Sequence, residues 1–158
     1  FKESETRYEN GELFKKDSIK NNDSLKYKTP KGKIVYGGGG IVPDIFVPLE
    51  DSHGAEGLTM LMQSGLVNYF VFEQLDQNRK KFEKITTEGL DKKIKSGNYF
   101  NNFKTYMAKG GLLFNLDNQK EKVLFYLHAE FVRQLFNEKA YYQLILKKDD
   151  MVNKVLSK

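Results

Sequence analysis

The spacing of hydrophobic and polar positions changes about one third of the way along the chain. Up to residue 50, apolar residues fall in short runs separated by turn residues. In the runs SLKYKT and KIVYG they take alternating or β-branched settings, which are typical of strands. Between the two runs, Pro30 presets φ and Gly32 adds conformational freedom, as a tight turn requires. The pattern therefore predicts a β-hairpin.

A further strand is predicted after the hairpin. Its apolar positions are Ile41, Val42, Ile45, Phe46 and Val47. Pro43 interrupts this run, and because proline cannot donate to a strand ladder, it favours an edge or a bend. Small and polar residues at positions 51–57 then predict a linker.

The rest of the chain has helical spacing, and no proline occurs there to break it. Three predicted helices carry these stripes: Val67, Phe70, Val71, Gln74 or Leu75, and Phe82; Phe100, Phe103 and Met107; Leu124, Leu127, Phe131 and Leu135. A last amphipathic helix is predicted from Tyr141, Leu144, Ile145, Met151, Val152 and Val155. We expect Gly110-Gly111 to end the second helix and Asp117 to cap the third.

These elements predict an α+β fold, in which a short β-hairpin and strand segment precedes a mainly α-helical domain. The predicted boundaries are 1–50 for the β segment, 51–57 for the linker and 58–158 for the helical domain. With 39% hydrophobic residues among 158, including 12 Phe and 9 Tyr, the chain can bury a core. The chain begins at Phe1 with no Met and no signal peptide, so we expect an excised piece or a processed product.

Composition and charge narrow the possible functions. No apolar run approaches the roughly 18 residues of a membrane span. The chain has no cysteine, which excludes disulfides, thiol nucleophiles and cysteine-ligated metals. The net charge is +5 and the pI is near 9.2, but the lysines are scattered among acids, as on a solvated helix surface. A nucleic-acid partner is therefore not expected.

Candidate chemical groups are few. His53 lies near Glu50, Asp51 and Glu56 in sequence, but their spacing matches no familiar metal site. His128 stands beside the apolar stripe of the third helix and is interpreted as a packing or surface residue. We expect no cofactor and no metal.

No nucleophile stands in a catalytic setting. Lys95-Ser96 and Ser157-Lys158 are adjacent pairs, but their hydrophilic surroundings would leave each lysine solvated and protonated. Asp149-Asp150 lies in a charged turn and is interpreted as solvated surface. The residues by themselves show no catalytic constellation.

Four consecutive glycines, at positions 37–40, separate the two apolar runs KIVY and IV. A phosphate loop would lead into a helix and end in Gly-Lys-Ser or Gly-Lys-Thr, whereas this run leads into Ile-Val-Pro-Asp. Glycine permits positive φ and close backbone approach. The run is therefore interpreted as a closely packed strand and turn.

The stretches RYENGELF and DSIKNNDSLKYKTPKGKIVYGGGGIVPDIFVP carry a resemblance to a known family. They resemble the end of the protease domain in carboxyl-terminal processing proteases (the S41, or tail-specific, family), in the version found in Bacteroidetes-type bacteria. The match covers Arg7 to Leu49. Its motif residues here are Tyr36, Gly37, Gly38, Gly39, Gly40, Ile41, Pro43 and Asp44. The helical part resembles the C-terminal extension of these proteases only in position and pattern.

The resemblance implies a serine endopeptidase of the periplasm or cell envelope, whose serine nucleophile, lysine base and PDZ domain all lie upstream of this element. No catalytic residue can be assigned in this chain, so the resemblance implies a non-catalytic C-terminal fragment with a structural or regulatory role. Its expected partners are the upstream protease and PDZ domains, the peptide substrate and a second copy of the chain through unpaired strand edges. The alternative is a stand-alone basic helical module that binds a protein or nucleic acid.

Overall fold

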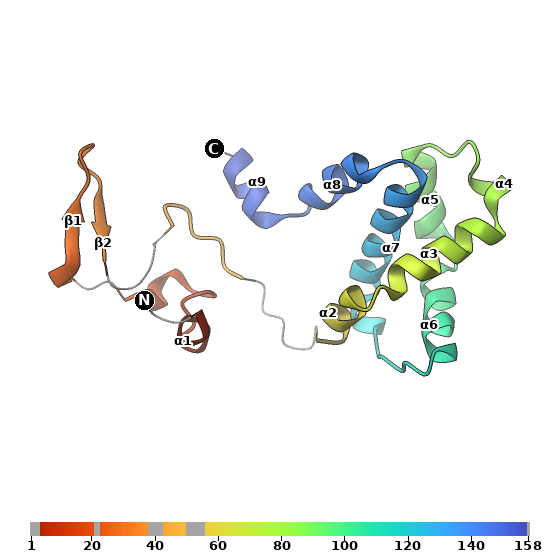
Figure 1. Cartoon of the computed structure of the whole chain (residues 1–158), viewed down its shortest axis with the longest axis horizontal. Helices are drawn as coiled ribbons and strands as arrows, with labels where there is room; N and C mark the ends of the chain where they lie inside the picture. The colour runs from red at the N-terminus through yellow and green to blue at the C-terminus, as the bar shows by residue number, and fades with distance from the viewer. Residues whose placement is uncertain (1–3, 21–22, 38–42, 50–55, 158) are drawn as a thin grey trace. The chain divides into compact units, whose positions relative to one another are not determined.

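The computed structural model describes residues 4–20, 23–37, 43–49 and 56–157. The chain divides into two compact units, one formed by residues 1–51 with 154–158 and the other by residues 52–153. The α+β fold class predicted from the sequence is confirmed, with a two-stranded hairpin near the N-terminus and helices in the later part of the chain (Figure 1).

The first unit contains short elements. They are α1 (Ser4–Glu9), the 3-10 turns η1 (Lys16–Ser18) and η2 (Asp23–Leu25), and the strands β1 (Lys26–Lys28) and β2 (Ile34–Tyr36). The strands pair antiparallel, with Tyr27 opposite Val35. In the turn, the Gly32 N–H donates to the Thr29 carbonyl at 2.8 Å, and Gly32 has a φ of 84°. The predicted hairpin is therefore confirmed, and glycine is needed where the chain enters the left-handed region.

Two predictions for this unit are wrong. The segment Ser4–Glu9 is helical rather than extended, with Glu5 in the first turn and Arg7 in the last, where each side chain complements the helix dipole. Gly11, with a φ of 73°, ends this helix and was the signal that could have indicated it. The predicted strand at 41–47 does not form in its described part, because residues 43–49 have no strand partner and both Pro43 and Pro48 lack an N–H to donate.

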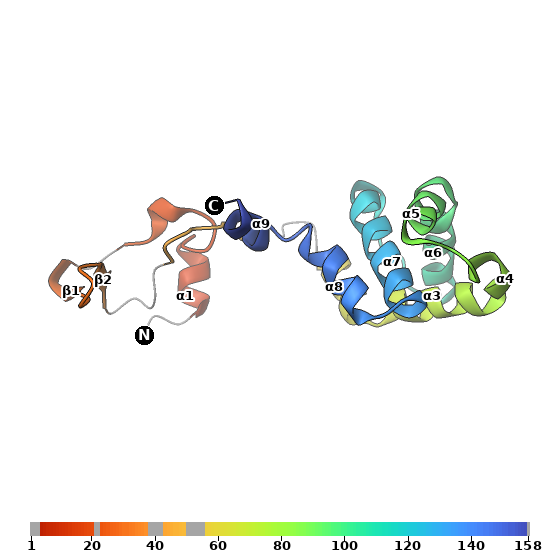
Figure 2. The same ribbon diagram turned by 90° about the horizontal axis from the view of Figure 1, so that it is seen from above.

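The second unit is helical, and α9 closes the chain (Figures 1 and 2). The elements from residue 56 onward are α2 (Glu56–Gln63), α3 (Leu66–Gln77), α4 (Arg79–Phe82), α5 (Thr87–Ser96), α6 (Tyr99–Lys109), η3 (Asp117–Gln119), α7 (Lys120–Leu135), α8 (Glu138–Leu146) and α9 (Asp150–Leu156). The last residues of α9, from 154 onward, are grouped with the first unit. The longest helix, α7, contacts α3, α5, α6 and α8, while α3 also contacts α6. The helical unit is thus organised around α7.

One hydrophobic core joins the helices from α2 to α7. Its buried members are Leu58, Leu61, Val67, Phe70, Val71, Phe82, Leu90, Ile94, Phe100, Phe103, Met107, Leu116, Val123, Leu127, Phe131 and Val132. The predicted stripe of α6 is buried in full, and α6 ends before Gly110-Gly111 as predicted. In α7, Leu127 and Phe131 are buried, whereas Leu124 and Leu135 are only partly covered. Helical spacing therefore located most of the core.

Several helix boundaries differ from the predictions. The helix expected through residue 82 breaks at Asn78, whose φ is −127° and whose side-chain amide donates to the Gln74 carbonyl at 3.1 Å. Asp117 does not cap α7, because a 3-10 turn intervenes and Gln119 occupies the position before the helix. The single C-terminal helix is two helices, and Asn137 caps the first of them by accepting from the Ala140 N–H at 2.9 Å. Side-chain hydrogen bonds accompany the boundaries at Asn78 and Asn137, whereas neither η3 nor α7 has a side-chain cap.

Candidate functional site

The glycine motif is only partly described. Gly38, Gly39, Gly40 and Ile41 lie outside the described residues, so their structural role stays a prediction. The Gly37 N–H donates to the Leu25 carbonyl at 2.8 Å, and a Cβ at Gly37 would lie 3.1 Å from the Tyr27 ring. The absence of a side chain at Gly37 therefore lets the hairpin and its aromatic ring pack closely.

The remaining motif residues lie at the surface or near it. Tyr36 is half-buried, and Pro43 and Asp44 are exposed. Asp44 forms an ion pair with Lys33, which brings the segment after the glycine run next to the start of β2. This geometry fits a structural role for the motif and shows no group poised for chemistry.

The candidate catalytic pairs have other hydrogen-bond partners. The Lys95 Nζ lies 2.8 Å from Asp91, and the Ser96 hydroxyl donates to the Lys92 carbonyl at 2.8 Å. The Ser157 hydroxyl donates to the Lys154 carbonyl at 3.1 Å. Ser96 and Lys95 therefore do not pair with each other, and Lys158 lies outside the described residues.

The acidic candidates also take local roles. Asp149 accepts a hydrogen bond from the Val152 N–H at 3.0 Å, and Asp150 stands in the first turn of α9. Both carboxylates thus serve the start of α9. His53 lies outside the described residues, and no three potential metal ligands come together in the described ranges. None of the described helices is long and apolar enough to cross a membrane.

His128 is half-buried between α7 and α5. Its Nδ1 lies 3.5 Å from Asp91 Oδ1, and its Nε2 is buried with no hydrogen-bond partner among the described residues. Burial is the main effect on His128 and lowers its pKa. The nearby Asp91 raises the pKa by less than burial lowers it, and Lys95 adds a smaller lowering, so the net shift of the pKa is downward. The neutral imidazole is thus the form that the folded state favours.

We expect the stability of the chain to fall as the pH drops through the range in which a free histidine titrates. The unfolded state takes up a proton at His128 near pH 6.5, before the folded state does, so the contribution is complete above that pH and declines below it. Urea unfolding at about pH 7 and about pH 5.5 would measure the difference. In His128→Gln the difference should shrink, and an unchanged difference would contradict this assignment.

A buried polar cluster, which sequence reasoning missed, connects α3 and α7. Glu130 is only 8% exposed. Its Oε1 accepts hydrogen bonds from Asn68 at 2.9 Å, Arg133 at 2.9 Å and Gln134 at 2.7 Å. The hydrogen bond that Arg133 donates to Glu130 is the main reason that the pKa of Arg133 is raised, and the Arg133 guanidinium lies over the Tyr141 ring of α8. The sequence signal for this cluster was Glu130, a lone acid inside the apolar stripe, with Arg133 three positions later.

Two clefts flank Phe82, the last residue of α4. The first, here called the apolar cleft, has a volume of about 580 Å³. Leu75, Ile85, Leu135 and Phe136 line it together with Phe82, and Arg79, Lys80 and Glu83 supply its charges. Apolar residues thus stand beside cations in one open cleft.

The second, here called the amide cleft, has a volume of about 470 Å³ and also touches Phe82. Its polar lining includes Gln74, Asn78, Asn98, Asn102, Lys81 and Lys93. The Lys93 Nζ lies 5.2 Å from the centre of the Phe82 ring, a cation–π contact. No carboxylate is among the described residues that line this cleft. The sequence pattern indicated only that the lysines lie on a solvated helix surface, and it did not connect Arg79, Lys80 and Lys81 with these clefts.

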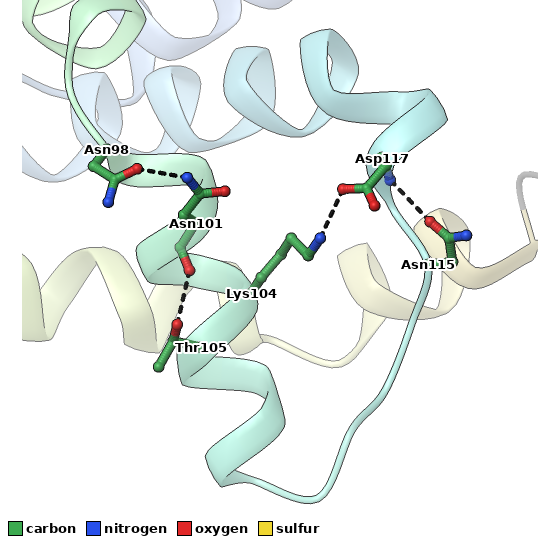
Figure 3. Close-up of polar contacts among 6 residues, drawn as sticks. All are labelled: Asn98, Asn101, Lys104, Thr105, Asn115 and Asp117. Carbon is green, nitrogen blue, oxygen red and sulfur yellow. Dashed lines mark hydrogen bonds and ion pairs between the residues drawn. The ribbon is translucent and has the colours of Figure 1, made fainter.

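A further polar cluster fixes the loop between α6 and α7 (Figure 3). The Lys104 Nζ lies 2.7 Å from Asp117, and the Asp117 N–H donates to the Asn115 side chain at 3.2 Å. On α6 itself, Asn101 donates to Asn98 at 2.7 Å. Since its polar groups pair with one another, this cluster is a structural connection rather than an open site.

Comparison with protein families decides where the chain belongs. The model described as "Family of unknown function (DUF8443)" matches residues 58–137, which is half of the chain. The chain belongs to this family. The DUF8443 region contains every buried apolar residue of the core, the Glu130 cluster except Tyr141, and both clefts. Among curated proteins and among solved structures, nothing matches the chain.

Proposed function

We propose that the chain is the non-catalytic C-terminal region of a serine-type carboxyl-terminal processing endopeptidase. In this proposal residues 1–50 complete the edge of the protease core, and the DUF8443 region is a helical domain with a structural or regulatory role. The active serine, the lysine base and the PDZ domain belong to the upstream part of the same polypeptide. The whole protein would act on protein C-termini in the periplasm or cell envelope.

One observation carries the proposal beyond the resemblance of Arg7–Leu49. Among the described residues up to position 49, no apolar side chain is buried, and Glu12 is the only buried residue. The exposed side chains include Tyr27, Ile34 and Val35 of the hairpin. A two-stranded hairpin is marginally stable unless further strands or a packed face support it. An N-terminal segment that has no core of its own would be stabilised if it formed the edge of a larger sheet.

The unpaired strand edges could be covered in two ways. The upstream protease sheet is the partner that the proposal favours, because the resemblance places this segment at the end of that domain. A second copy of the chain, paired through the same edges, is the other partner. Either partner would cover Tyr27 and Val35.

The alternative function is a stand-alone basic helical binding module. The observation that favours it is the location of the whole hydrophobic core, which lies within residues 58–132 and thus within the helical unit. Such a unit can bury its apolar surface without the N-terminal segment. The two proposals differ in whether a protease domain belongs to the same polypeptide.

We expect the purified 158-residue chain to leave casein and peptides with hydrophobic C-termini intact, because it lacks a nucleophile–base pair. An antibody raised against residues 58–137 would then recover the protein from its source cells. The proposal predicts a polypeptide larger than 18.3 kDa that cleaves the same peptides and reacts with a serine-directed acylating probe. Recovery of an inactive polypeptide of 18.3 kDa alone would favour the binding module, and labelling of a serine in the purified chain would overturn the non-catalytic assignment.

A further inference from the structure

We propose that the apolar cleft and the amide cleft together form a docking surface for a protein segment in which leucine or aromatic side chains stand next to Asp or Glu. Both clefts lie within the helical unit and share Phe82 as a common wall. The proposal does not depend on the protease assignment, because it rests only on the chemistry of these clefts.

The apolar cleft provides the site for the apolar side chains of the partner. Its volume of about 580 Å³ lies within the range of ligand-binding pockets. Leu75, Ile85 and Leu135 are half-buried, so each keeps part of its surface open, and Phe136 is 38% exposed. Covering this surface with a leucine or phenylalanine side chain would remove apolar area from water on both partners.

The charges around Phe82 favour an acidic partner. Four cations line the two clefts, Arg79, Lys80, Lys81 and Lys93, against one carboxylate, Glu83. Asp76 neutralises only Arg79, at 2.6 Å. The three lysines have no carboxylate within ion-pair distance among the described residues.

The two lysines of the amide cleft make neutral contacts instead of ion pairs. Lys81 donates to the Asn78 side-chain oxygen at 2.9 Å, and Lys93 lies over the Phe82 ring. Positive charge that the protein leaves uncompensated at a cleft attracts an anionic partner and aligns it.

The amide cleft adds neutral groups that suit a peptide. The side chains of Gln74 and Asn102 make no hydrogen bond to another residue of the described ranges and face this cleft. Amide groups can pair with the N–H and C=O groups of an extended peptide or with a carboxylate. A protein segment can contact the apolar cleft, the side-chain amides and the lysines at the same time.

A nucleic acid would fit these clefts less well than a peptide. Proteins that bind single strands combine a charged groove with open aromatic faces for base stacking. Here Phe82 is 4% exposed and already lies against Lys93, while the apolar cleft is mostly aliphatic.

The test begins with a phage library of short random peptides, selected against the immobilised full chain. We expect enrichment of peptides that combine Leu, Phe, Tyr or Trp with neighbouring Asp or Glu. An enriched peptide is then labelled with fluorescein and titrated by fluorescence anisotropy. Versions with its acids changed to lysine, or its apolar residues changed to alanine, should each bind about tenfold more weakly.

Variants of the full chain then place the interaction. Lys80→Glu combined with Lys81→Glu should weaken binding of the enriched peptide by about tenfold or more, and Phe136→Ala should weaken it as well. The matched control combines Lys109→Glu with Lys148→Glu, which makes the same charge change at exposed positions outside both clefts and should leave the affinity unchanged. Circular dichroism checks that each variant is folded.

Three results would overturn the proposal. One is a selection that enriches no peptide, and another is an enriched peptide that binds the cleft variants as tightly as the control. The third is a single-stranded DNA oligonucleotide that binds the chain more tightly than every enriched peptide and loses affinity in the Lys80/Lys81 variant. That third result would assign the surface to nucleic acid.

Discussion

Phe131→Ala should lower the free energy of unfolding of the helical unit by about 3–5 kcal/mol. Phe131 of α7 is fully buried. Its ring stacks on the Phe82 ring and meets the Tyr99 ring edge-on, with 5.5 Å between the ring centres in each case. Truncation removes these contacts and leaves a cavity where three helical segments meet. Urea unfolding followed by far-ultraviolet circular dichroism would measure the loss.

A matched control for this variant is Phe72→Ala. Phe72 is 57% exposed on α3, so its truncation should change stability by no more than about 0.5 kcal/mol. Leu127→Ala, on the same buried stripe as Phe131, should cost about 2–5 kcal/mol. If Phe131→Ala and Leu127→Ala both have the wild-type midpoint of urea unfolding, then α7 does not lie at the centre of the core.

Glu130→Ala should destabilise the helical unit by about 3 kcal/mol, although it removes an acid from a largely apolar helix face. The substitution leaves the side chains of Asn68 and Arg133 without this acceptor, whereas Gln134 keeps its hydrogen bond to the Asn68 carbonyl at 3.1 Å. Glu130→Gln keeps an acceptor oxygen and loses only the charge, so it should cost less, about 1.5 kcal/mol.

The control for Glu130 is Glu121→Ala in the first turn of the same helix. Glu121 is exposed, and its loss removes only a favourable interaction with the helix dipole, worth at most about 1 kcal/mol. A double-mutant cycle with Asn68→Ala should show non-additive losses, because the two side chains share one hydrogen bond across α3 and α7. Additive losses would mean that the cluster does not act as a unit.

Local patterns predicted the elements whose causes are themselves local. The hairpin follows from Thr29-Pro30-Lys31-Gly32, because a turn of this kind depends on φ at Gly32 and on bonds within five residues. Helix α6 follows from Phe100, Phe103 and Met107, whose spacing places them on one face whatever they pack against.

Predictions that depended on hydrogen-bond partners succeeded less well. The segment after the glycine run has the apolar residues of a strand, yet a strand also needs a partner strand. Described residues 43–49 pair with no strand, and the Leu49 N–H donates to the Leu13 carbonyl at 2.8 Å outside any sheet. The break at Asn78 and the cap at Asn137 likewise depend on which side chains reach the backbone. Hydrophobic spacing carries no information on whether a side chain or a backbone group will bond a given backbone partner.

The sequence by itself determined the α+β class, the location of the helical part and most of the core of α3, α6 and α7, because burial of an apolar stripe follows from its period. Only the tertiary structure decided that Glu130 is buried with partners on two helices, and that Phe82 is the common wall of two clefts. Asn68 and Glu130 are 62 positions apart. Groups so distant in sequence meet only after the helices have packed, so neither the cluster nor the clefts leave a local pattern.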